Sequence, residues 1–119
     1  MQTYKDLTVW QKSIALVTQI YLLTEGFPKS ELFGLTSQIR RSAVSIPANL
    51  AEGYARKHRK EYVQFVRVAY GSGAELETHL IISKNLKLAD SSQIQEIQDM
   101  LDEVMRMLNK LISSLVAKP

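Results

Sequence analysis

The sequence predicts an all-α fold, an antiparallel up-down four-helix bundle in a single domain over residues 1–119. Apolar residues recur at spacings of three and four over four long segments, which is the period of amphipathic α-helices. Short stretches rich in glycine, proline, aspartate or serine separate these segments, so consecutive helices are expected to be antiparallel neighbours. The chain has 119 residues, 45% of them hydrophobic, which is enough for one core.

The first helix is expected from Leu7 or Thr8 to Glu25. It carries two apolar rows, about 100° or more apart around the helix: Trp10, Ile14, Val17 and Tyr21 in one, and Leu16, Ile20 and Leu23 in the other. The combined arc is wider than one intramolecular contact requires. Either the whole arc is buried, or its outer row packs on another subunit. Gly26 and Pro28 end the helix.

The second helix is expected to begin near Ser30 or Glu31. Its inward row is Leu35, Ile39, Ala43, Ile46 and Leu50. Pro47 removes one backbone hydrogen bond, but the apolar period passes through it in phase, so we expect a kink there and not an end. Asn49 and Glu52 are expected to be buried or half-buried and to satisfy backbone groups that Pro47 leaves unpaired.

The third helix is expected from about Lys60 to Lys87. Its inner row is Tyr62, Val66, Ala69, Gly73, Leu76 and Leu80. Gly71 and Gly73 each destabilise a helix by up to about 1 kcal/mol relative to alanine. Such a pair marks a bend or a tight helix crossing, and we favour the crossing.

The fourth helix follows Asp90, Ser91 and Ser92, any of which could cap it, and Ser92 with Gln95 resembles a capping box. Its apolar residues are spaced alternately by three and four, as in a coiled-coil seam: Ile94, Ile97, Leu101, Val104, Leu108, Leu111 and Leu115.

Composition excludes several classes of protein. The absence of cysteine rules out disulfides, thiolate zinc sites and cysteine nucleophiles. No apolar run approaches the roughly 18 residues of a membrane span, and Lys5, Asp6 and Lys12 interrupt any signal-peptide core. We therefore expect a cytoplasmic protein that contacts no membrane. The net charge is +3, but residues 1–60 hold 9 Lys/Arg against 4 Asp/Glu, which indicates a polyanionic partner on one side or ordinary surface charge.

Residues typical of catalysis are sparse. Glu75 and His79 form one pair at the wrong spacing for a di-iron bundle site, which needs repeated Glu-x-x-His. No serine lies in a nucleophile turn, and the GSG at residues 71–73 follows no predicted strand. The sequence therefore predicts no enzyme, no catalytic residue, no metal, no cofactor and no small-molecule substrate.

Basic residues give the strongest functional signal. Guanidinium groups present paired donors to phosphate, and each neutralised phosphate releases counterions. Tyr54 and Tyr62 flank the most basic segment and could stack on unpaired bases. For the segment Arg56–Lys60, three roles remain open: contact with nucleic acid, a solvated connection, or contact with an acidic protein. The candidate nucleic-acid-binding residues are Arg40, Arg41, Arg56, Lys57, Arg59, Lys60 and Arg67.

Three strings carry a resemblance to a known family: LTVWQKS at Leu7–Ser13, FPKSELFGLTSQIRRSAVSIPANLAEG at Phe27–Gly53, and EYVQFVRVAYGSGAELETHL at Glu61–Leu80. They resemble the bacterial proteins encoded in intervening sequences of 23S ribosomal RNA genes, also called S23 ribosomal proteins. That family is similar in turn to the accessory variability protein of diversity-generating retroelements.

The resemblance implies a four-helix up-down bundle, a ring-like homopentamer, a nucleic-acid-binding role and no enzymatic activity. Arg40 and Arg41 match the paired arginines of the family motif, and Asn49, Glu52 and Gly53 match its end. Our hypothesis is a non-enzymatic, oligomeric bundle that binds RNA or DNA through its basic surface. The alternative is a protein-interaction scaffold in which Arg40 and Arg41 pair with carboxylates across a subunit interface.

Overall fold

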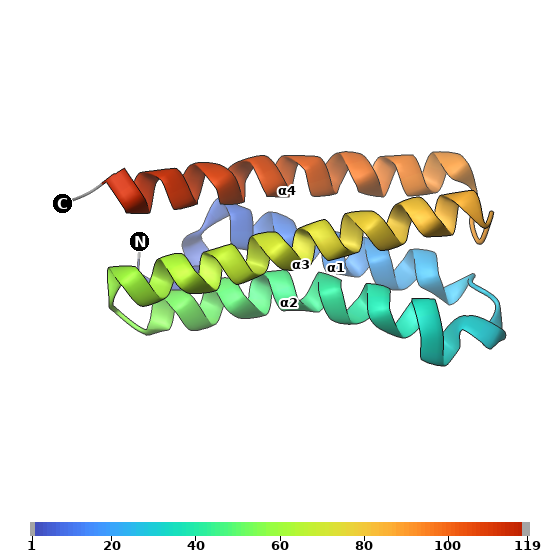
Figure 1. Cartoon of the computed structure of the whole chain (residues 1–119), viewed down its shortest axis with the longest axis horizontal. Helices are drawn as coiled ribbons and strands as arrows, with labels where there is room; N and C mark the ends of the chain where they lie inside the picture. The colour runs from blue at the N-terminus through green and yellow to red at the C-terminus, as the bar shows by residue number, and fades with distance from the viewer. Residues whose placement is uncertain (1, 118–119) are drawn as a thin grey trace.

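Four α-helices make up most of the chain (Figure 1). A computed structural model gives the structure and describes residues 2–117, so the ends of the expected 1–119 domain lie outside the described residues. The helices are α1 (Thr8–Glu25), α2 (Ser37–Ala55), α3 (Arg59–Asn85) and α4 (Ser91–Ala117). Consecutive helices pack against each other, and α1 also packs against α4. The all-α, four-helix up-down architecture is confirmed, in a rod of 48 × 22 × 20 Å.

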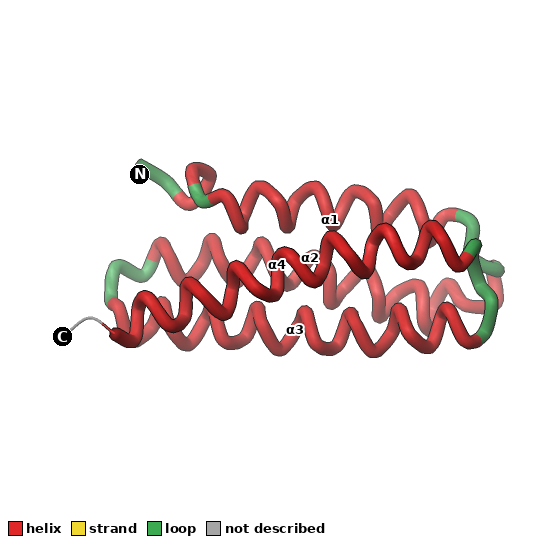
Figure 2. Tube along the Cα trace, turned by 90° about the horizontal axis from the view of Figure 1, so that it is seen from above, coloured by secondary structure: helices red, strands yellow, loops and turns green. Residues whose placement is uncertain are grey.

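The connections alternate between the two ends of the rod. The start of α1, the α2–α3 turn and the end of α4 lie at one end, whereas the α1–α2 and α3–α4 connections lie at the other (Figures 1 and 2). At 1.5 Å per residue, the 27 residues of α3 span about 40 Å between these ends. None of the described helices is long and apolar enough to span a membrane.

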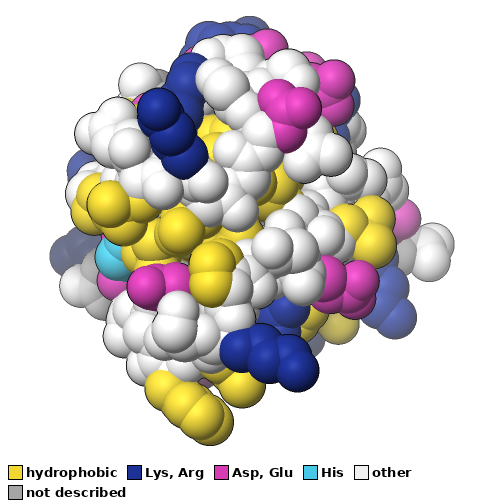
Figure 3. All heavy atoms as spheres, turned by 90° about the vertical axis from the view of Figure 1, so that its right-hand side faces the viewer, with side chains coloured by type: hydrophobic (Ala, Val, Ile, Leu, Met, Phe, Trp, Pro, Cys, Tyr) yellow, Lys and Arg dark blue, Asp and Glu magenta, His cyan; other side chains and the backbone are white. Residues whose placement is uncertain are grey.

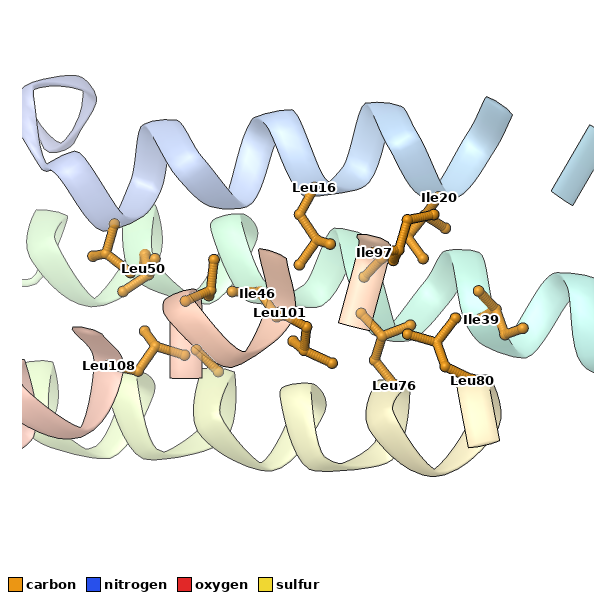
Figure 4. Packing of buried hydrophobic residues seen from close by; sticks show 14 of the residues in the cluster. Leu16, Ile20, Ile39, Ile46, Leu50, Leu76, Leu80, Ile97, Leu101 and Leu108 are labelled. Carbon is orange, nitrogen blue, oxygen red and sulfur yellow. The ribbon is translucent and has the colours of Figure 1, made fainter. Parts of the chain in front are cut away.

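The core runs along the bundle axis, and all four helices contribute to it (Figure 4). On α1 it takes the second apolar row, because Leu16, Ile20 and Leu23 are buried. The first row is the outer one, with Trp10 and Val17 half-buried and Ile14 and Tyr21 exposed. The wide apolar arc of α1 is therefore only partly used by the bundle.

On α2 the predicted inward row is confirmed from Ile39 onward, since Ile39, Ala43, Ile46 and Leu50 are all buried. Leu35, the first residue of the predicted row, is half-buried and lies before the regular helix. The predicted start is wrong. Lys29–Glu31 forms a 3₁₀ turn and Leu32–Thr36 a π turn, in which Gly34 leaves helical geometry with φ −114° and ψ −111°. This break delays the regular helix to Ser37.

The second helix continues through Pro47, as predicted. Asn49 is half-buried, and its side-chain amide donates to the carbonyl of Ser45 at 2.8 Å. That is not the group that Pro47 leaves unpaired, because a proline at this position removes the partner of the Ala43 carbonyl. Glu52 is exposed, so the expectation that it is buried or half-buried is wrong.

On α3 the predicted inner row is confirmed, with Tyr62 half-buried and the rest buried. A Cβ added at Gly73 would collide with the sulfur of Met105 on α4, so Gly73 marks a tight crossing as predicted. The same reading is wrong for Gly71, where a Cβ would meet nothing within 4 Å.

The seam of α4 is confirmed as far as Leu108, but the next buried residue is Ile112, while Leu111 is half-buried. A straight helix drifts about 20° per heptad relative to a 3.5-residue repeat, which moves the buried row by one position. Asp90 caps the helix, because its Oδ1 accepts hydrogen bonds from the Ser92 amide and hydroxyl, both at 2.9 Å. The first of these bonds is the main reason why the pKa of Asp90 lies below its ordinary value.

Candidate nucleic-acid interface

The seven candidate basic residues do not form one patch. Arg40 and Arg41 lie in the first half of α2, and Arg56–Lys60 lies at the α2–α3 turn. Arg41 and Arg56 are separated by about 22 Å along the helix axis, given 1.5 Å per residue. Arg67 lies further along α3, about 12 Å from the turn by the same measure.

Arg40 faces α1, where neutral groups hold it. Its Nε donates to the Thr24 hydroxyl at 2.9 Å, and its Cζ lies 4.5 Å from the centroid of the Tyr21 ring. A guanidinium over an aromatic face is attracted by the ring quadrupole. The side chain is half-buried, so part of its binding capacity is already used to join α1 to α2.

Arg41 faces α3 instead, as expected for two residues about 100° apart on one helix. Its Nη2 donates to Glu75 Oε2 at 2.9 Å and to Gln38 Oε1 at 2.8 Å. His79 Nε2 lies 3.5 Å from the same Glu75 oxygen, yet neither buried ring nitrogen makes a hydrogen bond within residues 2–117. We take this contact as proximity only, because 3.5 Å is long for a hydrogen bond. Arg41 is therefore neutralised inside its own chain.

Arg41 begins a polar stripe on the side of α2 that faces α3. Ser45 and Ser72 share a hydrogen bond of 2.8 Å across the two helices, and Asn49 donates to the Ser45 hydroxyl at 2.9 Å. Residues at spacings of three and four share one helix face, so the stripe extends along the helix. We define the polar stripe as Arg41, Ser45, Asn49, Glu52 and Arg56.

Arg56 ends the polar stripe and is also paired. Its Nη2 lies 3.1 Å from Glu52 Oε1, and its Cζ lies 5.2 Å from the centroid of the Phe65 ring. The ion pair is exposed on both sides and is therefore weak. Arg56 can release its partner for a phosphate more readily than a buried arginine could.

The remaining cations surround the α2–α3 turn. Lys57, Lys60 and Arg67 are exposed, and none pairs with a carboxylate of residues 2–117. Lys57 has a left-handed backbone, with φ 63°, which ends α2 and turns the chain into α3. Arg59 is the first residue of α3 and is exposed. The cations Lys57, Lys60 and Arg67 thus lie at the turn and in the first third of α3.

An exposed apolar segment near the other end escaped sequence analysis. Phe33 is 94% exposed and lies in the π turn before α2. It borders a hollow of about 590 Å³ that is also lined by Tyr21, Thr36, Arg40 and Val44. Viewed from this end, hydrophobic side chains gather at the surface and project at its lower edge (Figure 3). The exposure of Phe33 could have been expected from the sequence, because this residue falls outside the inward row of α2.

Comparison with known proteins adds a family and a fold. The family model described as "23S rRNA-intervening sequence protein" matches residues 5–110. A crystal structure of a protein of unknown function from the S23 ribosomal protein family of Bacteroides thetaiotaomicron is similar, with a TM-score of 0.80 and 23% identity. The alignment covers 88% of this chain and 98% of that one. A comparison with curated proteins finds no match.

Proposed function

The chain belongs to the 23S rRNA-intervening sequence protein family, and we propose that it is a non-enzymatic, cytoplasmic bundle that binds RNA or DNA. Contact would be made by the basic turn, which we define as Arg56–Lys60 together with Arg67. Arg40 and Arg41 would add a second, weaker contact because their guanidinium groups already have partners within the chain.

One observation carries this proposal. Lys57, Lys60 and Arg67 are exposed cations without a carboxylate partner in residues 2–117. They are separated from one another by at most about 15 Å along the helix axis, given 1.5 Å per residue. Cations in this state can neutralise phosphates without first breaking an ion pair. The release of condensed counterions then favours binding.

A titration with a single-stranded RNA at several salt concentrations tests the proposal. The logarithm of affinity should fall linearly with the logarithm of salt concentration. Replacing Lys57 and Lys60 by glutamine should weaken binding and reduce that slope by about 1.4, since each phosphate contact on a single strand contributes about 0.7. The same experiment with DNA of matched sequence shows which nucleic acid is preferred.

A matched control removes the same charge elsewhere. Lys84→Gln with Lys87→Gln lowers the net charge equally but acts at the opposite end of α3, about 40 Å away. If this control reduces the salt slope as much as the double substitution of Lys57 and Lys60 does, binding depends on net charge only. An affinity that salt does not change would rule out a phosphate-driven complex.

We also propose that copies of the chain associate, into the homopentamer that the family resemblance implies. The supporting observation is the apolar surface left outside the bundle, where Phe33 is 94%, Leu32 47% and Val44 41% exposed. Burying such a patch against a second copy removes apolar area from water. Light scattering should then give a mass well above the 13.5 kDa of one chain. A mass of one chain at all concentrations would contradict this.

A further inference from the structure

A hollow of about 270 Å³ lies at the basic turn, between the ends of α2, α3 and α4. Tyr54, Lys57, His58, Arg59 and Tyr62 line it, and Leu115 of α4 closes one side. It therefore joins basic side chains and two aromatic rings in one concave place. The volume is below the roughly 300–1,000 Å³ of sites for drug-sized ligands, so it suits a single small group.

The hydroxyl of Tyr62 is buried and finds no hydrogen-bond partner within residues 2–117. Buried polar groups are normally paired, so the Tyr62 hydroxyl keeps a hydrogen-bonding capacity that no described residue uses. Burial, with the nearby phenol of Tyr54 as a smaller cause, raises the pKa of Tyr62. The phenol therefore keeps its proton at neutral pH, and a rotation of the ring that opens the hydroxyl toward the hollow would let it donate to a ligand there.

The two rings leave an aromatic surface available. Tyr54 and Tyr62 have centroids 5.8 Å apart at an interplanar angle of 89°, an edge-to-face pair. In such a pair the ring that presents its edge keeps its own faces out of the contact. Tyr54 is only half-buried, so part of this pair remains open to a planar group from solvent.

Positive charge borders the same hollow. Lys57 makes no ion pair with a carboxylate of residues 2–117, and its left-handed backbone places it in the connection itself. α3 begins beside it, with His58 as a cap residue that makes no side-chain capping bond. The helix start adds partial positive charge to that of the side chains. An anion is therefore favoured at the mouth of the hollow.

We propose that this hollow binds one unpaired nucleotide of a single-stranded nucleic acid. The base lies against Tyr54 and accepts a hydrogen bond from the Tyr62 hydroxyl, while its phosphate contacts Lys57 and His58. This inference rests on the proposed function and adds a preference to it. A paired base cannot leave its stack without an energetic cost, so a duplex cannot use the hollow in the same way.

The test compares a short single-stranded oligonucleotide with a blunt duplex of the same sequence, both at one fixed salt concentration. Tyr54→Leu retains an apolar side chain but removes the ring, and should weaken single-strand binding by about tenfold or more. Duplex binding should stay unchanged. Tyr62→Phe removes only the hydroxyl and keeps the ring, so it guards against a failure of Tyr54→Leu to fold, and it should weaken single-strand binding several-fold.

The outcomes separate this inference from the proposed function. If the unmodified protein binds both oligonucleotides, and shows the expected salt dependence in the titration described above, but neither tyrosine variant affects the single strand, the nucleotide site is wrong and the phosphate-driven interface stands. Equal losses for single strand and duplex in the folded variants also overturn the nucleotide site. If neither oligonucleotide binds the unmodified protein, both the proposed function and the nucleotide site are wrong.

Discussion

Arg41 Nη2 lies 2.9 Å from Glu75 Oε2, and this ion pair joins α2 to α3 at one end of the polar stripe. Arg41 is one of the paired arginines that the sequence predicts to contact phosphate, and it has a carboxylate partner within its own chain. Its role can be separated from that of the lysines by experiment.

A double-mutant cycle on Arg41→Ala and Glu75→Ala should give a coupling of about 0.2–1 kcal/mol, because the pair is largely exposed and screened by solvent. Urea unfolding of the four proteins measures it. Arg41→Ala should also leave the salt slope of RNA binding closer to that of the unmodified protein than Lys57→Gln with Lys60→Gln does. A larger loss of slope from Arg41→Ala would contradict the neutralisation of Arg41 by Glu75.

Three glycines should respond differently to alanine. Gly71→Ala should stabilise the protein by up to about 1 kcal/mol, since the added Cβ meets open space and alanine favours helix. Gly53→Ala should destabilise it by about 1–3 kcal/mol, because the new Cβ would lie 2.6 Å from Phe65 Cβ, close to a rigid backbone. Gly73→Ala should fall between them, because the flexible Met105 side chain can move aside. Denaturant unfolding midpoints give the order, and a stabilising Gly53→Ala would refute the close packing of α2 on α3.

The cap at Asp90 should make stability depend on acid. The folded state lowers the pKa of this carboxyl from its ordinary value of 3.8, so the cap contributes fully above that value. The contribution is lost as pH falls through the lowered pKa. Asp90→Asn keeps an acceptor oxygen but cannot titrate, so its melting temperature should fall less between about pH 5 and pH 2. Asp102→Asn, also exposed on α4 but outside the cap, is the control for the loss of one negative charge.

Phe33→Ser should lower the mass measured by light scattering while leaving the melting temperature of the separated chains unchanged. The reason is that the side chain is 94% exposed and contributes little to the bundle itself. Val116→Ser is a suitable control, because Val116 is also exposed, at 57%, but lies near the end of α4. An unchanged mass after Phe33→Ser would show that this segment is not part of a subunit contact.

Much of the fold follows from hydrophobic periodicity. The buried rows of α2 and α3 were predictable because each helix has one apolar row that fits one core. The row of α1 was ambiguous, since two apolar rows compete and only packing decides that Leu16 and Ile20 are inside. The late start of α2 was hidden because Leu32–Thr36 contains no proline, and the break rests on the backbone of Gly34 alone.

The candidate interface was predictable only in composition. Charge counting identifies the seven basic residues, but it cannot tell which have partners. Glu75 is 34 positions from Arg41 in the sequence, so their ion pair depends on how α2 packs against α3. Likewise the hollow between Tyr54, Tyr62 and Leu115 requires three helix ends to meet, and helical spacing within one segment contains no information about that.

The departure from helical geometry at Gly34 uncouples the neighbouring segment from the rest of α2. Since Phe33 precedes the break, its direction is set by a short local turn and not by the phase of the buried row. Exchanging or lengthening Lys29–Gly34 would therefore redirect the most accessible aromatic side chain without moving a core residue. The contact that Phe33 makes with another molecule could therefore change, by engineering or by natural sequence drift, while the folding of the bundle stays the same.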